Sequence, residues 1–273
     1  MEIERAYDFS KLKLGKVKMP FTSLSLREIS EMAKKVTPYK ESGEGKKKQV
    51  TRMFDTISGE YDKLNRVISF GTDIRWRKRV VSILASKKPR RILDIATGTG
   101  DLAIALKQTG AEQIVGLDIS PGMLDIGKRK VKEHALDDTI EMVIGDSEAL
   151  QYKEDTFDAA TVAFGVRNFE DLRKGLKEIY RVLKPGGTLV VLETSVPTRF
   201  PFKQGYYLHS RYLLPMIGRI FSKDRSAYRY LSESAAAFPY GEAFNNILKE
   251  IGFIGIECRP QTFGVASIYI ATK

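Results

Sequence analysis

The stretch DIATGTGDLAIAL, residues 94–106, decides the fold class of this chain. It passes from a short apolar strand through a glycine turn into a helix, which places backbone N–H groups and a positive helix end beside a ligand. Gly98 and Gly100 permit close approach of that ligand, and with Ala103 they also satisfy the G-x-G-x-x-G/A spacing of dinucleotide-binding proteins. The segment therefore predicts a nucleotide-type site without choosing the ligand.

Short apolar segments rich in Val and Ile alternate with amphipathic segments after residue 90, which is typical of a parallel sheet with crossover helices. The last two, 253–261 and 264–273, are joined too closely for a helix and should pair antiparallel. We therefore expect an α/β fold with a seven-stranded, mostly parallel sheet, an antiparallel C-terminal hairpin and helices on both faces. This is the Rossmann-like sheet of class I methyltransferases. The expected parallel strands are 91–96, 113–119, 140–146, 157–165 and 187–195.

Acidic residues lie at the ends of the first three expected strands. Asp118 stands twenty residues after Gly98, where it can accept hydrogen bonds from two ribose hydroxyls. Asp94 suits the ammonium of a methionine moiety and would repel a pyrophosphate, which favours S-adenosylmethionine over a dinucleotide. Asp146, with Ser147 beside it, lies where class I methyltransferases often accept from the adenine amino group. Each acid can instead be a helix N-cap.

The chain divides into an extension and one larger domain. Residues 1–49 are expected to be the extension, with an amphipathic helix at 24–36 and a flexible linker in ESGEGKKK, residues 41–48. The domain is expected to span 50–273 and to begin with two cap helices within 50–87. Its aromatic and basic insertion, 198–238, is expected to be a substrate lid.

Composition points to a soluble cytoplasmic protein with an anionic partner. The net charge is +11, and no apolar run is long enough to span a bilayer. The basic residues of the insertion would meet anionic lipid headgroups, so peripheral contact with the inner face of the membrane is expected. These residues are Arg211, Arg219, Lys223 and Arg225. Oligomeric state is left open, and homo-oligomers are compatible with the sequence.

Cysteine and histidine are scarce in this chain. The single Cys258 cannot form an intramolecular disulfide, and His134 and His209 are the only histidines. No cluster has the spacing of metal ligands, so no structural metal is expected.

The segments YDKLNRVISFGTDIRW (61–76) and RVLKPGGTLVVLETSVP (181–197) resemble signatures of the ubiquinone/menaquinone biosynthesis C-methyltransferase family. The second is shared by many small-molecule methyltransferases, whereas the first is much narrower. Further matching segments are DIATGTGD (94–101), FGVRN (164–168), YRYLSES (228–234) and the terminal GVASIYIATK (264–273). The resemblance covers about residues 46–273.

The resemblance implies S-adenosylmethionine-dependent C-methylation of an isoprenoid naphthoquinol, with demethylmenaquinol as substrate in menaquinone biosynthesis. It places cofactor contacts at Thr97, Asp118, Asp146 and Ser147, and it places helices containing Tyr61 and Asn65 over the cofactor. The chain departs from the family pattern at three positions. Thr194 replaces the usual Phe, and Arg66 and Asp73 replace the expected Asp and His.

Carbon methylation of a quinol requires ring electron density, gained as a phenolic proton departs, and a methyl group held in line with the ring carbon. Arg167 follows the fourth expected strand, where its fixed charge can stabilise a phenolate. An ion pair with a neighbouring acid is the alternative role for Arg167. Glu193, His209 and Tyr206 are the candidate proton acceptors, in no order.

Other functions also fit parts of the sequence. The same chemistry can act on a benzoquinol of the ubiquinone pathway. A nucleic-acid methyltransferase can use the basic aromatic insertion, but an NPPY-type motif and a recognisable RNA-binding module are missing from the sequence. A non-enzymatic scaffold is disfavoured by the intact acidic positions, and hydride transfer by the terminal hairpin and Asp94.

Overall fold

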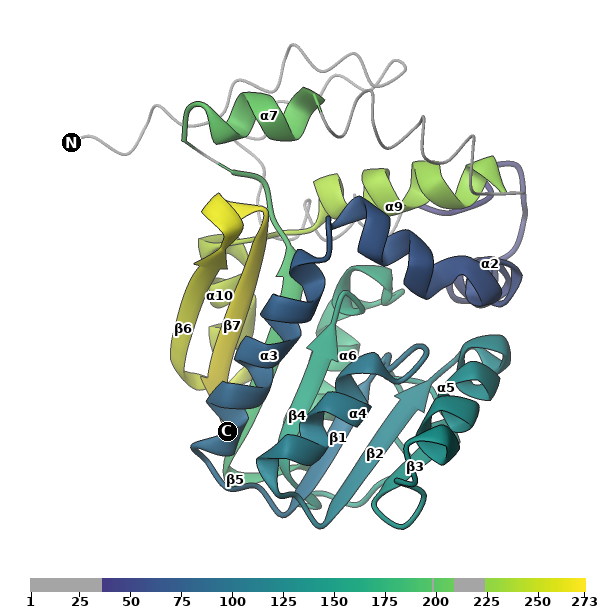
Figure 1. The fold of residues 1–273 in the computed structure, drawn as a ribbon. Coiled ribbons are helices and arrows are strands. Elements are labelled where there is room, and N and C mark those ends of the chain that lie inside the picture. Colours follow the sequence, from purple (N-terminus) through teal and green to yellow (C-terminus); the bar gives the residue numbers. More distant parts are fainter. Residues whose placement is uncertain (1–35, 198, 209–223) are drawn as a thin grey trace, which may run out of the picture.

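A seven-stranded sheet with helices on both faces forms the body of the molecule (Figure 1). The computed structural model describes residues 36–197, 199–208 and 224–273. The strands are β1 (Arg91–Ile95), β2 (Gln113–Asp118), β3 (Ile140–Ile144), β4 (Phe157–Ala163), β5 (Leu183–Thr194), β6 (Ile254–Gln261) and β7 (Ala266–Thr272). The expected mostly parallel sheet with an antiparallel C-terminal hairpin is confirmed.

The order of the strands positions the site. The sheet runs β3-β2-β1-β4-β5-β7-β6, with β3 to β5 parallel and β7 antiparallel to both β5 and β6. Strand β1 lies between β2 and β4, so the chain changes direction across the sheet at β1. Open α/β sheets bind ligands at such a switch point, outside the carboxyl ends of the strands.

The helices form two layers and a cover. In Figure 1, α3, α4 and α5 lie on one face of the sheet and α6 and α10 on the other, whereas α2 and α9 cross above the carboxyl ends of the parallel strands. The helices are α2 (Lys46–Ile68), α3 (Thr72–Ala85), α4 (Asp101–Leu106), α5 (Pro121–Glu133), α6 (Leu172–Val182), α7 (Phe202–Leu208), α9 (Arg225–Ala237) and α10 (Glu242–Ile251). Short 3₁₀ turns are η1 (Lys107–Thr109), η2 (Val166–Asn168) and η4 (Thr262–Gly264).

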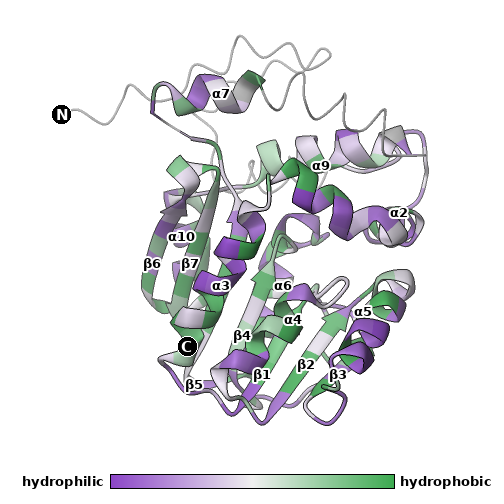
Figure 2. Ribbon diagram, viewed as in Figure 1, coloured by the Kyte–Doolittle hydropathy of each residue, from purple (hydrophilic) through white to green (hydrophobic). Residues whose placement is uncertain are grey.

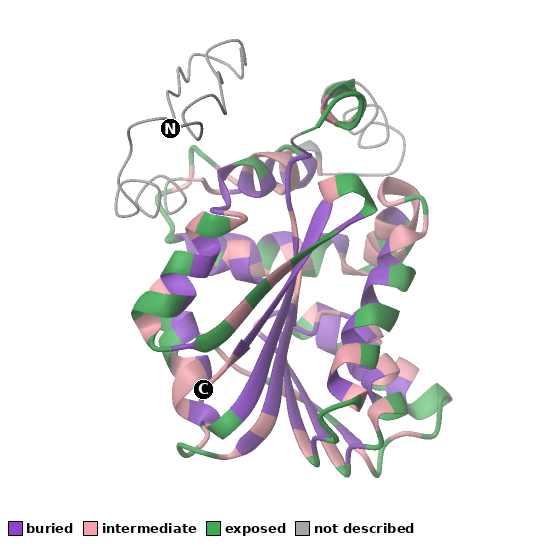
Figure 3. Cartoon of the chain, turned by 90° about the vertical axis from the view of Figure 1, so that its left-hand side faces the viewer, coloured by how far each residue is buried: buried purple, intermediate pink, exposed green. Residues whose placement is uncertain are grey.

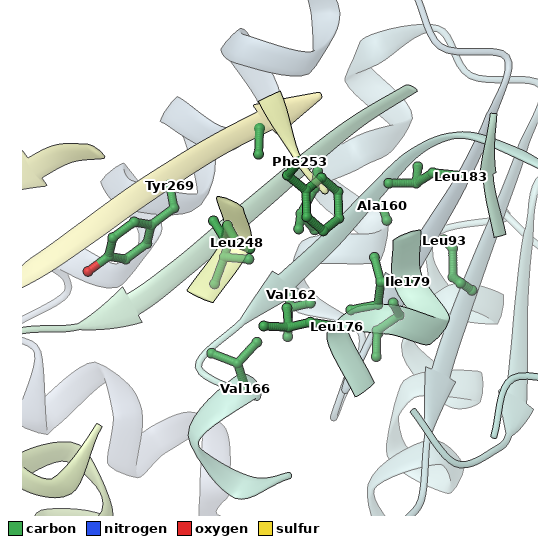
Figure 4. Close-up of a cluster of buried hydrophobic side chains, with 14 of the residues drawn as sticks. Leu93, Ala160, Val162, Val166, Leu176, Ile179, Leu183, Leu248, Phe253 and Tyr269 are labelled. Atoms are coloured by element: carbon green, nitrogen blue, oxygen red, sulfur yellow. The ribbon is translucent and has the colours of Figure 1, made fainter. Parts of the chain in front are cut away.

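Each face of the sheet has its own apolar core, because successive residues of a strand point to opposite faces. Leu93, Ile179 of α6 and Leu248 of α10 belong to the core on one face (Figure 4), whereas Ile92 belongs to the core beneath α3, α4 and α5 on the other. The central strands are buried almost throughout (Figure 3), and the helices turn their polar faces outward (Figure 2). Each fully buried large apolar side chain contributes about 1.5–3 kcal/mol.

A third apolar cluster holds the cover in place. Met53 and Leu64 of α2 pack with Tyr230 of α9 and Met123 of α5. Helix α2 is thus fixed both to the other covering helix and to a helix of the sheet layer.

The structure differs from the sequence expectations at several boundaries. The segment ESGEGKKK was expected to be a linker, but its lysines form the first turn of α2, so the expected domain start at residue 50 falls inside this helix. Strand β5 begins at Leu183, four residues before the expected start, because the KPGG segment continues the strand. The expected helix at 24–36 lies almost entirely outside the described residues.

Candidate active site

A cavity opens at the carboxyl ends of β1 to β4, beneath α2. Its empty volume, counted together with the open space at its mouth, is about 680 Å³. It is lined from the loops after four strands by Ala96, Gly98, Asp118, Ile119, Asp146, Ser147, Glu148, Phe164, Asn168 and Phe169, and from α2 by Lys47, Val50, Phe54 and Tyr61. One helix therefore closes a site that four strand ends build.

The loop after β1 takes the conformation that its glycines allow. Gly98 has φ +58° and Gly100 has φ +79°, both in the left-handed region that favours glycine. A Cβ on Gly100 would lie 3.0 Å from Cε of Met142, and a Cβ on Gly98 would lie 4.0 Å from the ring of Tyr61. The glycines thus let the loop turn sharply beneath α2, with Gly98 facing the cavity.

Asp118 joins the loops after β1 and β2. Its Oδ2 accepts from the Gly98 N–H at 2.8 Å and its Oδ1 from the Ser120 N–H at 2.9 Å. Burial raises the pKa of this carboxyl, and these N–H donors oppose that effect. Each carboxylate oxygen keeps a further lone pair, and the side chain lines the cavity, so Asp118 can still accept from hydroxyl groups.

Asp94 and Thr97 lie beneath the loop and do not line the cavity. Asp94 is 1% exposed and accepts from the hydroxyls of Thr97 and Thr161, both at 2.6 Å. Burial raises the pKa of Asp94 to about 6, against the effect of those two hydroxyl donors. These contacts connect Asp94 to the loop after β1, and its contact with the ammonium group of the cofactor stays a prediction.

Asp146 and Ser147 line the cavity after β3, as the sequence suggested. The Oδ2 of Asp146 accepts from Nζ of Lys47 at 2.7 Å, and its Oδ1 caps the N–H of Glu148 at 2.9 Å. Lys47 also lies 3.4 Å from Glu148. The first turn of α2 is thereby tied to the loop after β3.

Arg167 and Glu193 form a buried ion pair at the carboxyl ends of β4 and β5. Burial acts to lower the pKa of Arg167, but Glu193 raises it overall, so the guanidinium stays charged. Glu193 Oε1 also accepts from the Thr194 N–H at 2.7 Å. Among the described residues, Arg167 Nε and Glu193 Oε2 are buried without a hydrogen-bond partner. The ion pair that the sequence analysis gave as the alternative role of Arg167 is present, and the stabilisation of a phenolate by Arg167 stays a prediction.

Further polar side chains surround this pair. The hydroxyl of Tyr230, which is fully buried, donates to Oδ1 of Asn168 at 3.1 Å. Arg167 also acts electrostatically on the hydroxyls of Tyr61 and Tyr230. Asn168 lines the cavity, so it connects this polar group to that space.

Sequence reasoning missed Tyr230 and Lys47 as site residues. Tyr230 belongs to the segment YRYLSES, which matched the family, and Lys47 belongs to the charged segment ESGEGKKK, which was interpreted as a linker. Neither pattern by itself indicates a residue of the site. The candidate base His209 lies outside the described residues, as do Arg211, Arg219 and Lys223.

Two departures from the family pattern contact each other. Arg66, at the end of α2, forms an ion pair with Asp73, at the start of α3, and a second one with Asp101 at 2.8 Å. Asp73 also pairs with Arg77. The expected Asp and His at positions 66 and 73 are thus replaced together by a pair of opposite polarity.

Three comparisons place this arrangement among known proteins. Residues 42–273 match the model of the ubiE/COQ5 methyltransferase family. The demethylmenaquinone methyltransferase of Bacteroides fragilis is 46% identical over 240 residues, covering 88% of this chain and 98% of the relative. The demethylmenaquinone methyltransferase of Thermus thermophilus is 46% identical over 223 residues, covering 81% of this chain and 100% of the relative.

A solved S-adenosylmethionine-dependent methyltransferase from Thermotoga maritima has the same fold. It superposes with a TM-score of 0.58 at 19% identity, covering 82% of this chain and 99% of that one. The sheet and its flanking helices are therefore those of the Rossmann-like methyltransferases.

Proposed function

The chain belongs to the ubiE/COQ5 methyltransferase family, and from that premise we propose that it methylates a ring carbon of demethylmenaquinol to give menaquinol. It is an S-adenosylmethionine-dependent methyltransferase. The observation that carries the proposal is the buried Arg167–Glu193 pair beside a cavity built on the loops after β1 to β4. That arrangement provides a cofactor space and, next to it, charged groups suited to a phenolic oxygen.

The residues around the cavity fit S-adenosylmethionine. Asp118 retains lone pairs for ribose hydroxyls, and Gly98 permits close approach of the ligand. Asp146 and Ser147 lie at the other end, where they suit the adenine. Asp94 and Thr97 would act from below by holding the loop, and Gly100 by letting it turn. The bound cosubstrate supplies an electrophilic methyl group.

The acceptor must be activated by the protein. Loss of the phenolic proton raises the electron density of the quinol ring, and the ring carbon then forms its bond to the methyl group as the carbon–sulfur bond breaks. Arg167 would stabilise the phenolate by charge, since a guanidinium does not act as a base at ordinary pH. Glu193 Oε2, buried without a donor in the described chain, would receive the phenolic proton. Rearomatisation releases the ring proton.

We expect the same end of the molecule to contact the membrane that holds the isoprenoid substrate. None of the described helices is long and apolar enough to span a bilayer. Large apolar side chains are nevertheless exposed around the carboxyl ends of the strands, with Phe263 and Phe202 stacked 3.8 Å apart. The exposed fractions are 79% for Phe200, 74% for Phe70 and 68% for Phe263. Exposed apolar side chains on a protein whose net charge is +11 suit an anionic lipid surface.

Product analysis tests the proposed reaction. Purified protein is incubated with S-adenosylmethionine and reduced demethylmenaquinone analogues, with demethylated benzoquinols in parallel, and products are identified by mass spectrometry. A methyl group gained on a naphthoquinol ring carbon is the expected result. Methylation of the benzoquinol alone would move the enzyme to the ubiquinone pathway, and no methylated quinol would contradict the proposal.

Vesicle binding tests the membrane contact separately. Wild type is expected to sediment with vesicles that contain anionic phospholipid and less with neutral ones. The double variant Phe200→Ser/Phe263→Ser should bind both more weakly while it still methylates a short-tailed, water-soluble quinol. Equal sedimentation of the variant and wild type would refute this surface.

A further inference from the structure

Three consecutive lysines begin α2, and each has a different environment. Lys46 is 4% exposed, Lys47 is half-buried at the rim of the cavity, and Lys48 is exposed. Successive helical residues point about 100° apart, which explains why neighbours in the sequence meet different parts of the protein. The three side chains thus provide a matched series on one helical turn.

Lys46 occupies a position that opposes a cation. It is the first residue of a 23-residue helix, where the positive end of the helix dipole repels positive charge. Burial lowers the pKa of Lys46 to about 8, although Glu148 and Glu170 act in the other direction. Buried charges persist where specific contacts compensate for their desolvation, so the contacts of Lys46 indicate its purpose.

Two hydrogen bonds of Lys46 are made to the backbone of the loop after β4. Nζ of Lys46 donates to the carbonyl oxygen of Arg167 at 3.1 Å and to that of Phe169 at 2.9 Å. The two carbonyls stand on either side of Asn168. One ammonium group therefore fixes the short 3₁₀ turn that presents both Arg167 and Asn168.

We infer that Lys46 is a positioning residue for methyl transfer, which sets the Arg167 and Asn168 side chains against the methyl acceptor by holding the backbone on both sides of Asn168. The inference rests on the proposed function. Because Lys46 belongs to α2, its two hydrogen bonds to the loop after β4 form only while α2 lies over the cofactor cavity. Covering of the cofactor and positioning of the acceptor side are thereby coupled.

Lys47 performs the complementary task on the cofactor side. It reaches Asp146 and Glu148 after β3, and it lines the cavity. Adjacent lysines of α2 thus contact different loops, and their loss should alter different kinetic quantities.

The test compares Lys46→Met, Lys47→Met and Lys48→Met in the full chain. Methionine keeps the unbranched apolar stem and removes the charge and donors. Three quantities are measured: kcat with a demethylmenaquinol analogue, the Kd of S-adenosylmethionine by calorimetry, and the thermal midpoint. Lys46→Met should lower kcat about 100-fold, as expected for a misplaced catalytic group, with the Kd within about twofold of wild type. Lys47→Met should raise the Kd of S-adenosylmethionine about tenfold. Lys48→Met should match wild type in all three quantities.

Rescue separates positioning from folding. Lys46 lines a small cavity with Val166, Phe238 and Pro239, and Lys46→Arg keeps a charge and N–H donors for the same carbonyls. It should recover much of the lost kcat. A Lys46→Met enzyme with wild-type kcat, or one whose cofactor binding and thermal midpoint collapse with kcat, would overturn the inference. An inactive wild type would instead overturn the proposed function on which it rests.

Discussion

The two halves of the site differ in how completely their polar groups are paired. On the cofactor half, Asp94 accepts from two hydroxyls, Asp118 from two backbone N–H groups, and Asp146 from Lys47 and a backbone N–H. On the acceptor half, Arg167 Nε and Glu193 Oε2 are buried without a partner in the described chain. Because buried polar atoms in native proteins are rarely unpaired, this contrast supports the proposal that the methyl acceptor binds on the half with Arg167 and Glu193.

The contrast also separates two kinds of preorganisation. The cofactor half takes its shape from short acids that brace loops, and these contacts exist without any ligand. The acceptor half stores a charged pair whose desolvation is only partly offset. We expect changes in the first half to weaken binding and changes in the second to remove catalysis and, when one charge is left alone, stability.

Arg167→Met should have the largest effect. It leaves the Glu193 carboxylate, which is fully buried, without its counter-ion, and breaking such a pair costs about 3–5 kcal/mol of unfolding free energy. Removal of the charge that stabilises the phenolate should lower kcat by about 10³. Chemical denaturation and steady-state kinetics measure the two effects.

The double variant Arg167→Met/Glu193→Met sharpens this prediction. Removal of both charges should restore most of the unfolding free energy, because no unpaired charge remains buried. It should leave kcat as low as in the single variant. Recovery of activity with stability would mean that the pair serves the fold alone.

Asp118→Ala is expected to weaken S-adenosylmethionine binding about 100-fold, with binding measured by calorimetry. The change removes the proposed acceptor for ribose hydroxyls and leaves the N–H groups of Gly98 and Ser120 without their acceptor. Asp125→Ala, an exposed acid on α5, is the matched control and should bind as wild type. An unchanged affinity in Asp118→Ala would remove the cofactor half from its assigned role.

Asp94→Asn tests whether the bracing of the loop depends on charge. The pKa of Asp94 is about 6 in the folded protein against 3.8 ordinarily, so folding disfavours the charged form. The associated penalty is present at pH 7 and is relieved as the pH falls through 6. Wild type should therefore gain about 1 kcal/mol relative to Asp94→Asn between pH 7 and pH 5. A difference in unfolding free energy that is independent of pH would contradict this interpretation.

The sequence predicted the cofactor half better than the acceptor half, and the reason is geometric. Asp118 and Asp146 each follow an apolar strand, and parallel strands bring their carboxyl ends to one edge, so chain order alone places them together. Lys46 and Tyr230 reach the site from helices far apart in sequence, and their contacts depend on how α2 and α9 pack. Asp94 lies at the expected strand end, yet only the structure shows its two hydroxyl donors.

Tyr230→Phe should have the smallest effect and sets the limit of the comparison. Burial raises the pKa of Tyr230 well above its usual range, so its hydroxyl remains a donor to Asn168 at any working pH. Its loss should lower the unfolding free energy by less than about 1 kcal/mol and kcat by about fivefold, with the Kd of S-adenosylmethionine unchanged. Tyr180→Phe, on the opposite layer against Phe253, controls for the substitution itself. Tyr230→Phe could instead weaken cofactor binding and leave kcat intact. In that case Asn168, the last residue of η2, would belong to the cofactor half, and the acceptor half would begin after this turn.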